Sequence, residues 1–310
     1  MERKVIVIAG PTCSGKTDLS LLLAEELNSE IISADSRQFF KYLDIGTAKP
    51  GTDSLKKIKH YFINSLNPDE YYNASKYEKD ALEVCENLIN QNKIPVVAGG
   101  SGLYIKALVD GIFDSADVDT DYRNFLLNQK ELYGNEYIYS ELKKVDPESA
   151  SKMLPQNWKR VLRALEVYHQ TGEPIWKQQK IYKRDEEIKF RQFGLTWQRK
   201  ELYSNIENRV DEMLSKGLVD EVRNILNMGF SEKLNSLNTV GYKEIISYLN
   251  NEITLERAVE LIKRNTRHYA KRQLTWFNGD KRIKWFKVDK KYDLKRISEE
   301  ILEDINQAKA

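Results

Sequence analysis

The residues Val5-Ile-Val-Ile-Ala9 and, directly after them, Gly10-Pro-Thr-Cys-Ser-Gly15-Lys16-Thr17 stand near the start of the chain. The first five are a continuous apolar, mostly β-branched run, which is typical of a strand buried on both faces of a sheet. The next eight satisfy the phosphate-loop pattern GxxxxGK[ST] in full, and leucines at helical spacing follow them. Strand, glycine-rich loop and helix in this order predict a P-loop.

The loop predicts a site for a diphosphate or a nucleotide. Its eight residues are Gly10, Pro11, Thr12, Cys13, Ser14, Gly15, Lys16 and Thr17. Glycines let the backbone curl, so that N–H groups converge on phosphate oxygens at a helix N-terminus, where the helix dipole favours anions. Lys16 adds a positive charge, and the Thr17 hydroxyl is the predicted ligand of Mg²⁺.

Patterns further along the chain predict a doubly wound α/β core. Short apolar runs at 30–34 and 94–98 predict two more buried strands, and residues 74–91 between them have helical spacing. Strands and helices alternating at these lengths favour a parallel sheet flanked by helices, as in P-loop NTPases. The later expected elements are strands at 190–196 and 282–288 and helices at 200–216, 219–228, 242–249 and 254–276.

The pattern changes between about residues 116 and 186. Helical periodicity continues there, at 122–132, 137–145 and 158–169, without a good buried strand. We therefore expect an inserted all-helical domain at 116–186. The P-loop core would then consist of residues 1–115 and 187–310, with a helical C-terminal part.

Composition and charge argue against a membrane-spanning protein and against a secreted one. The 310 residues have a mean hydropathy of −0.61, two cysteines and a net charge of +2. No run approaches eighteen apolar residues, and the start is wrongly charged for a secretory signal, so we expect a cytoplasmic protein without a membrane span. Between Arg257 and Arg296, fourteen Lys and Arg stand against four Asp and Glu, a local +10 that leaves −8 elsewhere. Such a stretch is typical of a surface that binds a polyanion, and equally of a charged surface that only contacts solvent.

The strand predicted at 94–98 ends in Gly99-Gly-Ser101 and not in a carboxylate. P-loop hydrolases usually place an Asp there to hold Mg²⁺ through water, so motor and GTPase functions are disfavoured. Ser101 is a candidate donor to a second ligand group, unless the glycines only form a tight turn.

Asp35 is the acidic residue that follows a neighbouring strand. Open α/β sheets bind ligands beyond the carboxyl ends of their strands, so Asp35 should face whatever the P-loop holds. It is a candidate base acting on a second substrate. Capping a following helix would explain it equally well.

Further blocks stand out along the chain: Gly10–Thr17, Ser33-Ala-Asp-Ser36 with Gln38, Asp44-Ile-Gly-Thr-Ala-Lys-Pro50, Gly99-Gly-Ser-Gly-Leu-Tyr104, Arg160–Val167, Arg209–Leu214 with Gly217-Leu, Val240-Gly-Tyr242 and Lys271–Phe277. In this order and over nearly the whole chain, they resemble the bacterial tRNA dimethylallyltransferase family, also called tRNA isopentenyltransferases. The block Asp44–Pro50 is the most specific, because no general argument about phosphate binding requires it.

The resemblance implies an activity. A dimethylallyl group would pass from dimethylallyl diphosphate to N6 of the adenosine immediately 3′ of the anticodon, in tRNAs that read codons beginning with U. It implies Asp35 as the base, with Lys16, Thr17, Ser101 and Arg209 around the diphosphate or the transferring group. The implied partners are dimethylallyl diphosphate and the tRNA anticodon stem-loop, and we expect a monomer.

The resemblance also implies tRNA contacts. The matched residues are Asp35, Ser36, Arg37, Gln38, Ser101, Arg123, Lys159, Arg160, Val161, Leu162, Arg163, Val240, Gly241, Tyr242 and Lys243. Arg160 and Arg163 are three apart on one helix face and suit phosphate contact, although surface ion pairing would also explain them. Two positions depart from the family, since Arg37 stands for a usual Met and Lys159 for a usual Gln. Both add positive charge, and they put base selectivity in doubt.

Two other functions fit parts of the pattern. A P-loop kinase would use the same loop, with Asp35 as the base on a hydroxyl group. A non-catalytic, NTP-dependent RNA-binding module would need only the basic C-terminal stretch, but it gives no reason for a carboxylate beside an anion site.

Overall fold

A computed structural model describes residues 3–112, 119–177, 187–290 and 292–307. The chain divides into two compact units. The first, unit 1, combines Met1–Val109 with Glu186–Ala310, and the second, unit 2, is Asp110–Asp185. Each unit is described by itself.

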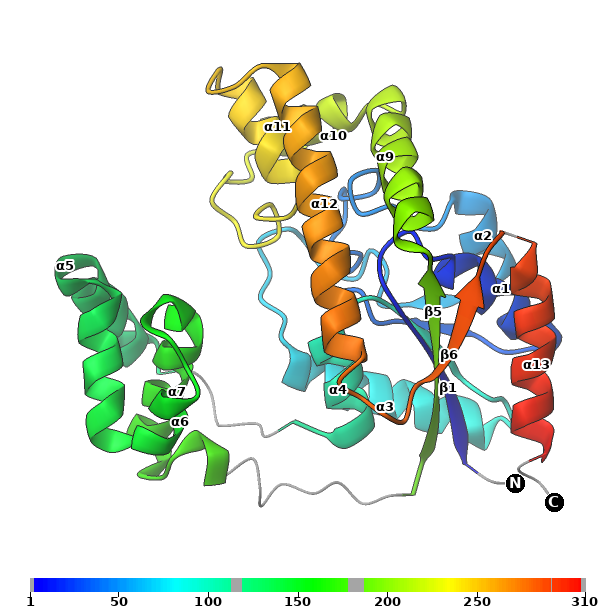
Figure 1. Cartoon of the computed structure of the whole chain (residues 1–310), viewed down its shortest axis with the longest axis horizontal. Coiled ribbons are helices and arrows are strands. Elements are labelled where there is room, and N and C mark those ends of the chain that lie inside the picture. Colours follow the sequence, from blue (N-terminus) through cyan, green and yellow to red (C-terminus); the bar gives the residue numbers. More distant parts are fainter. Residues whose placement is uncertain (1–2, 113–118, 178–186, 291, 308–310) are drawn as a thin grey trace. The chain divides into compact units, whose positions relative to one another are not determined.

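A six-stranded parallel sheet forms the centre of unit 1 (Figure 1). Its spatial order is β3-β2-β4-β1-β5-β6, so β1 is central and neighbours β4 on one side and β5 on the other. The strands are β1 (Lys4–Ala9), β2 (Ile31–Ser33), β3 (His60–Tyr61), β4 (Val96–Ala98), β5 (Lys189–Trp197) and β6 (Lys284–Val288). The order reverses at β1, which is where open parallel sheets bind ligands.

Both faces of β1 are buried, as its apolar run predicts. Val5, Val7 and Ala9 pack into a cluster with α3 (Ala74–Asn90) and α4 (Gly102–Asp110). Ile6 and Ile8 point the other way, into a cluster with α1 (Lys16–Glu26) and α13 (Asp293–Gln307). Because successive side chains of a strand alternate between faces, one continuous apolar run supplies two cores.

Four helices form a group beyond the carboxyl end of β5 (Figure 1). They are α9 (Arg199–Ser215), α10 (Leu218–Asn227), α11 (Tyr242–Leu249) and α12 (Leu255–Phe277). Their apolar faces enclose a third core with Phe40 and Leu43 from the segment after β2. The long helix α12 runs from this third core, where Ile262 lies, to the core that the sheet forms with α3 and α4, where Phe277 lies.

Unit 2 is helical in its described residues and has its own core. It contains α5 (Thr120–Val145), α6 (Pro147–Ser151), the 3-10 helix η1 (Pro155–Asn157) and α7 (Trp158–Thr171). Leu126, Ile138, Leu142 and Leu165 pack together there. The break expected between two helices near residue 134 is a kink inside α5, where Gly134 has φ 83° and ψ 178°.

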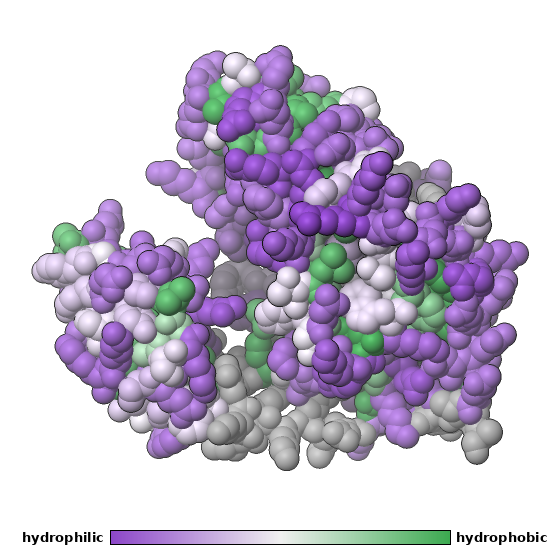
Figure 2. Space-filling model, viewed as in Figure 1, coloured by the Kyte–Doolittle hydropathy of each residue, from purple (hydrophilic) through white to green (hydrophobic). Residues whose placement is uncertain are grey.

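The expected α/β fold is confirmed, and most expected elements begin and end within two residues of the observed ones. The expectations missed α2 (Thr52–Lys57), β3, α4, α6 and α13. Helix α2 buries no residue, so it has no apolar periodicity to detect. No helix in the described ranges is long and apolar enough to cross a membrane. The face drawn in Figure 2 is mainly hydrophilic, with apolar patches scattered between polar side chains.

Gly99 supports a prediction about stability, because β4 passes too close to β2 there for any side chain. A Cβ at Gly99 would lie 2.1 Å from the carbonyl oxygen of Ala34. We expect Gly99→Ala to lower the free energy of unfolding by about 2 kcal/mol or more, since backbone must move. Urea unfolding measures this.

The matched control is Gly51→Ala. A Cβ there meets nothing within 4 Å, and φ is −62°, so stability should change by less than about 0.5 kcal/mol. Equal stability of the two variants would contradict the close-contact argument.

Candidate active site

Three loops meet at the carboxyl ends of the adjacent strands β2, β4 and β1. They are the segment from Asp35, the Gly99–Ser101 turn and the P-loop. Asp35, Gly100 and the P-loop residues Thr12–Thr17 line one cavity of about 600 Å³. The parallel arrangement of the strands therefore brings the predicted anion site and the predicted base to one place.

The P-loop is held in its curled form by contacts within the loop and by a bond from Trp197. Gly15, with φ 92°, caps the N-terminus of α1 in the left-handed region. The Lys16 Nζ donates to the Pro11 carbonyl at 2.5 Å, and the Trp197 indole donates to the Ser14 carbonyl at 3.0 Å. The loop is thus preorganised at the start of a helix, where backbone amides favour an anion.

Arg209 reaches the P-loop from the middle of α9. Its Nη1 lies 3.2 Å from the Thr12 hydroxyl and 3.5 Å from the Cys13 Sγ. The guanidinium therefore adds positive charge beside the loop that already carries Lys16. A P-loop with two cations and a helix N-terminus is suited to a highly charged phosphate group.

The pKa of Lys16 is lowered from 10.5 to about 8, mainly by burial; the Asp35 carboxylate opposes this shift and the Arg209 charge adds to it. The ammonium is thus poised to gain from a bound anion, which would restore its usual pKa. This balance makes Lys16 sensitive to pH in the alkaline range.

Asp35 does not cap a helix. One of its carboxylate oxygens accepts the backbone N–H of Arg37 at 2.9 Å, which forms a side-chain-stabilised turn, and the next helix is α2. The turn leaves the carboxylate lining the cavity. The capping explanation of Asp35 is therefore wrong, and its position suits a base.

Ser101 joins the two loops around Asp35. Its hydroxyl accepts the Ser36 N–H at 2.9 Å and donates to the Ser36 hydroxyl at 3.2 Å, and its own N–H donates to the Ala34 carbonyl at 3.2 Å. It also bonds to the phenol of Tyr269, whose pKa is raised by burial. Ser101 thus fixes the Asp35 turn and lies beside the cavity.

Gln273 and Tyr269, both on α12, are cavity-lining residues that sequence reasoning missed. The Gln273 Oε1 accepts the Thr12 N–H at 2.9 Å, and its Nε2 donates to the Gly100 carbonyl at 2.8 Å. Gln273 therefore clamps the P-loop to the β4 turn and occupies one amide expected to serve phosphate. The block Lys271–Phe277 contained the signal, but nothing in it showed which side chain points inward.

Two segments predicted to contact tRNA lie in unit 1. Arg37 is held by a bond from Nη1 to the Asn235 carbonyl at 2.7 Å, and burial lowers its pKa. In the segment Val240–Lys243, Gly241 has φ 101°, Tyr242 is fully buried and Lys243 is exposed. Tyr242 can therefore support this segment from within, whereas Lys243 is accessible to a ligand.

The remaining predicted contacts lie in unit 2, on α5 and α7. Lys159 and Arg160 are exposed, but Val161 and Leu162 are buried in the core of this unit. Arg123 and Arg163 both pair with the buried carboxylate of Glu166, at 3.3 and 3.4 Å. Arg163 thus makes the kind of ion pair that was the alternative explanation for it, and Arg123 shares the same partner.

The residues present fit magnesium only together with a phosphate ligand. Among the described residues, no group of three His, Cys, Asp or Glu side chains could hold a metal ion. Thr17 is exposed at the start of α1 and lines the cavity. Mg²⁺ commonly takes one or two protein oxygens, substrate phosphates and several waters, so a single hydroxyl beside a phosphate site suits it.

Comparisons with known proteins point to one family of transferases. A family model described as IPP transferase matches residues 38–280. The tRNA dimethylallyltransferase of Alkaliphilus oremlandii is 43% identical over 305 residues, which cover 98% of this chain and 97% of that protein. The crystal structure of a tRNA isopentenylpyrophosphate transferase from Bacillus halodurans has a TM-score of 0.72 at 34% identity, and covers 98% of this chain and 97% of that one. A solved eukaryotic dimethylallyltransferase acting on tRNA has a TM-score of 0.74 at 30% identity, and covers 94% of this chain and 75% of that one.

The lowered pKa of Lys16 predicts how anion binding depends on pH. Below about pH 8 the amine is charged before the anion binds, whereas above it binding must also take up a proton. We expect the affinity for inorganic diphosphate to fall by roughly three- to tenfold per pH unit above pH 8. Titration calorimetry over this range measures it.

Lys16→Arg is the control, because arginine keeps its charge throughout and any titration of the ligand is common to both proteins. The alkaline loss should be smaller in this variant. The same pH profile in both proteins would show that Lys16 does not titrate there.

Proposed function

This chain belongs to the IPP transferase family, and we propose that it transfers a dimethylallyl group from dimethylallyl diphosphate to N6 of the adenosine 3′ of the anticodon, in tRNAs that read codons beginning with U. The observation that carries the proposal is the single cavity lined by both the P-loop and Asp35. An anion site and a carboxylate facing one space suit a reaction in which a diphosphate leaves and a proton is removed.

The P-loop would hold the leaving group. As the allylic C–O bond breaks, negative charge grows on the diphosphate and positive charge on the allyl carbon. Lys16, Arg209 and the amides at the start of α1 would stabilise this growing anion, because they are fixed before the reaction begins. No phosphoryl group moves, which agrees with the lack of a carboxylate at the end of β4.

Asp35 would remove the proton. The adenine amine is a poor nucleophile, because its lone pair is delocalised into the ring. A carboxylate hydrogen-bonded to N6–H accepts the proton while nitrogen bonds to the allyl carbon. The turn that fixes Asp35 through the Arg37 amide and Ser101 supports this role, since a base must be positioned within hydrogen-bonding distance.

Magnesium would be held by the Thr17 hydroxyl and the diphosphate, and it would supply further positive charge to the leaving group. For tRNA, we propose that Asp35–Gln38 meets the extruded base and that Arg123, Lys159, Arg160 and Arg163 meet the anticodon arm. Arg37 and Lys159 add charge to these surfaces. The monomeric state and the cytoplasmic location stay predictions.

The alternatives lose their support. The relatives that match nearly the whole chain are named as tRNA dimethylallyl- or isopentenyltransferases. The comparisons give no support to the hypotheses of a kinase or of an RNA-binding module.

One assay tests the reaction class. The protein is incubated with tRNA and either dimethylallyl diphosphate or ATP, and the tRNA nucleosides are then analysed by mass spectrometry. We expect a five-carbon gain on an adenosine with dimethylallyl diphosphate and no change with ATP. A phosphate gain with ATP would overturn the proposal.

Asp35→Asn tests the base. The variant keeps the size of the side chain and its bond to the Arg37 amide but cannot accept the proton, so we expect turnover to fall by about 10²- to 10⁴-fold. Binding of inorganic diphosphate should stay the same or become tighter, because the P-loop residues are unaltered and a negative charge beside the anion site is removed. Single-turnover kinetics and calorimetry measure the two. A variant that turns over at the normal rate would remove Asp35 from the chemistry.

A further inference from the structure

The loop Leu43–Pro50 lies in no helix or strand, but it forms one wall of the cavity through Thr47, Ala48, Lys49 and Pro50. It is closed by bonds of its own. The Lys49 N–H donates to the Asp44 carbonyl at 3.0 Å, and the Thr47 hydroxyl donates to the Leu43 carbonyl at 2.5 Å. The shape of this wall therefore depends on the contacts that hold the loop against the rest of unit 1.

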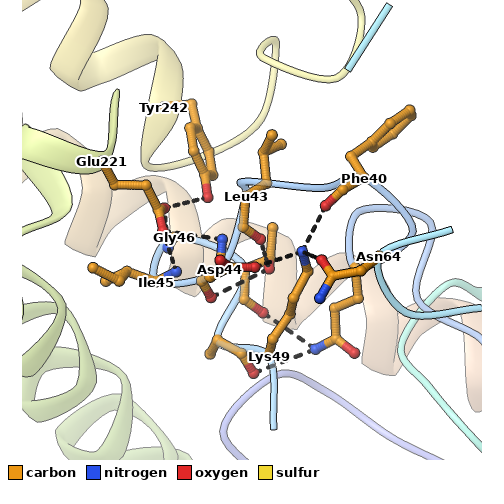
Figure 3. A network of polar contacts seen from close by, with 12 residues as sticks. Phe40, Leu43, Asp44, Ile45, Gly46, Lys49, Asn64, Glu221 and Tyr242 are labelled. Carbon is orange, nitrogen blue, oxygen red and sulfur yellow. Dashed lines mark hydrogen bonds and ion pairs between the residues drawn. The ribbon is translucent and has the colours of Figure 1, made fainter. Parts of the chain in front are cut away.

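Glu221, in the first turn of α10, anchors one side of the loop (Figure 3). Its carboxylate accepts three consecutive backbone N–H groups, those of Asp44 at 3.0 Å, Ile45 at 2.7 Å and Gly46 at 3.1 Å. The Tyr242 hydroxyl donates to the same carboxylate at 2.6 Å. Four donors on one carboxylate make a strong and directional attachment, because charge-assisted hydrogen bonds are stronger than neutral ones.

Gly46 fits this attachment because it lies flat against Tyr242. A Cβ at Gly46 would lie 2.5 Å from the ring. Burial raises the pKa of the Tyr242 phenol well above its usual value, so the hydroxyl remains a donor to Glu221 at any physiological pH. The ring and the carboxylate together define where the first half of the loop lies.

Lys49 anchors the other side of the loop with the opposite charge (Figure 3). Its side chain is only 3% exposed. The ammonium donates to the Phe40 carbonyl at 2.5 Å, the Asp44 carboxylate at 2.7 Å and the Asn64 side-chain oxygen at 2.5 Å. Burial lowers the pKa of Lys49, while Asp44 opposes that shift. Three acceptors satisfy the three ammonium protons, as a buried amine requires.

The anchored loop in turn holds Gln38. The Gln38 Nε2 lies 3.3 Å from both the Thr47 and the Ala48 carbonyl oxygens, and the Ser33 hydroxyl lies 3.4 Å from its Oε1. The position of the loop therefore decides how the amide of Gln38 is oriented. Gln38 also lines the cavity, three residues after Asp35.

We propose that Glu221 is a positioning residue for the tRNA nucleotide, which acts by docking the loop Leu43–Pro50 so that Gln38 is oriented toward the cavity. The proposal rests on the function proposed above. It separates two halves of the site, because Glu221 bonds to the wall beside Gln38 and makes no contact with the P-loop amides in the described residues. Glu221 should therefore matter for tRNA and not for diphosphate.

A double-mutant cycle tests this with Glu221→Gln, Gln38→Ala and the double variant. Each single change should raise the KM for tRNA about tenfold, the equivalent of one well-made hydrogen bond. Because both changes act through the side-chain amide of Gln38, the double variant should also raise the KM for tRNA about tenfold and not a hundredfold. The dissociation constant for dimethylallyl diphosphate should stay within about twofold in all three.

Asp220→Asn is the matched control on the same helix. Asp220 is exposed and pairs with Arg223 of α10, so losing its charge should leave the KM for tRNA unchanged or lower it slightly. A rise in KM for Glu221→Gln is then opposite in sign to any effect of removing a negative charge near a polyanion. Tyr242→Phe removes one of the four donors and should raise the KM by about twofold.

The outcomes are distinct. Additive effects of the two single changes, or equal losses for tRNA and dimethylallyl diphosphate, would overturn the positioning role. If Glu221→Gln does not fold, Tyr242→Phe decides, and an unchanged KM in that variant counts against the proposal. A wild-type protein that gives no five-carbon product would instead defeat the proposed function.

Discussion

The parallel pairing of β2, β4 and β1 is the constraint on which the site depends. Parallel strands end at the same edge of a sheet, so the Asp35 turn, the Gly99–Ser101 turn and the P-loop have to lie next to one another. The pairing is close enough that Gly99 meets the Ala34 backbone. Helices α9 and α12 also line the cavity, with Arg209 and Gln273 reaching back to the P-loop.

The charges around the cavity suit a reaction that separates charge. Lys16, Arg209 and the start of α1 bring positive charge to the cavity, and Asp35 provides a negative group in the same space. Keeping Lys16 charged costs free energy while no anion is bound, because burial lowers the pKa of its ammonium group. Two charged side chains of opposite sign hold the loop that forms one wall of the cavity. Glu221 accepts bonds from three backbone amides and the Tyr242 hydroxyl, and Lys49 donates to the Phe40 carbonyl, the Asp44 carboxylate and the Asn64 side-chain oxygen.

Much of the fold could be predicted because its signals are local. The β1 run, the P-loop and the helices 200–216 and 242–249 depend on residues close together in the sequence, and these elements agree closely with the structure. The final helix α13 was missed although Leu294, Ile297, Ile301 and Ile305 have helical spacing. Local patterns also pointed to Thr12–Thr17 and Asp35, which the structure places in one cavity. Gln273 and Glu221 were not recognised, since an isolated Gln or Glu on an amphipathic helix is indistinguishable from a surface residue.

The sequence by itself determined the α/β class, the phosphate loop and the family, because these follow from short patterns and from the order of blocks. It could not decide which charges meet. The basic stretch Arg257–Arg296 divides among α12, β6 and α13, and Lys263, Arg267 and Lys284 pair there with Asp211, Glu207 and Asp304. The local +10 is thus partly neutralised by carboxylates from other segments of the chain. Only the tertiary structure decided this, and likewise the meeting of Glu221 with residues 44–46, because such contacts join segments that lie far apart in the chain.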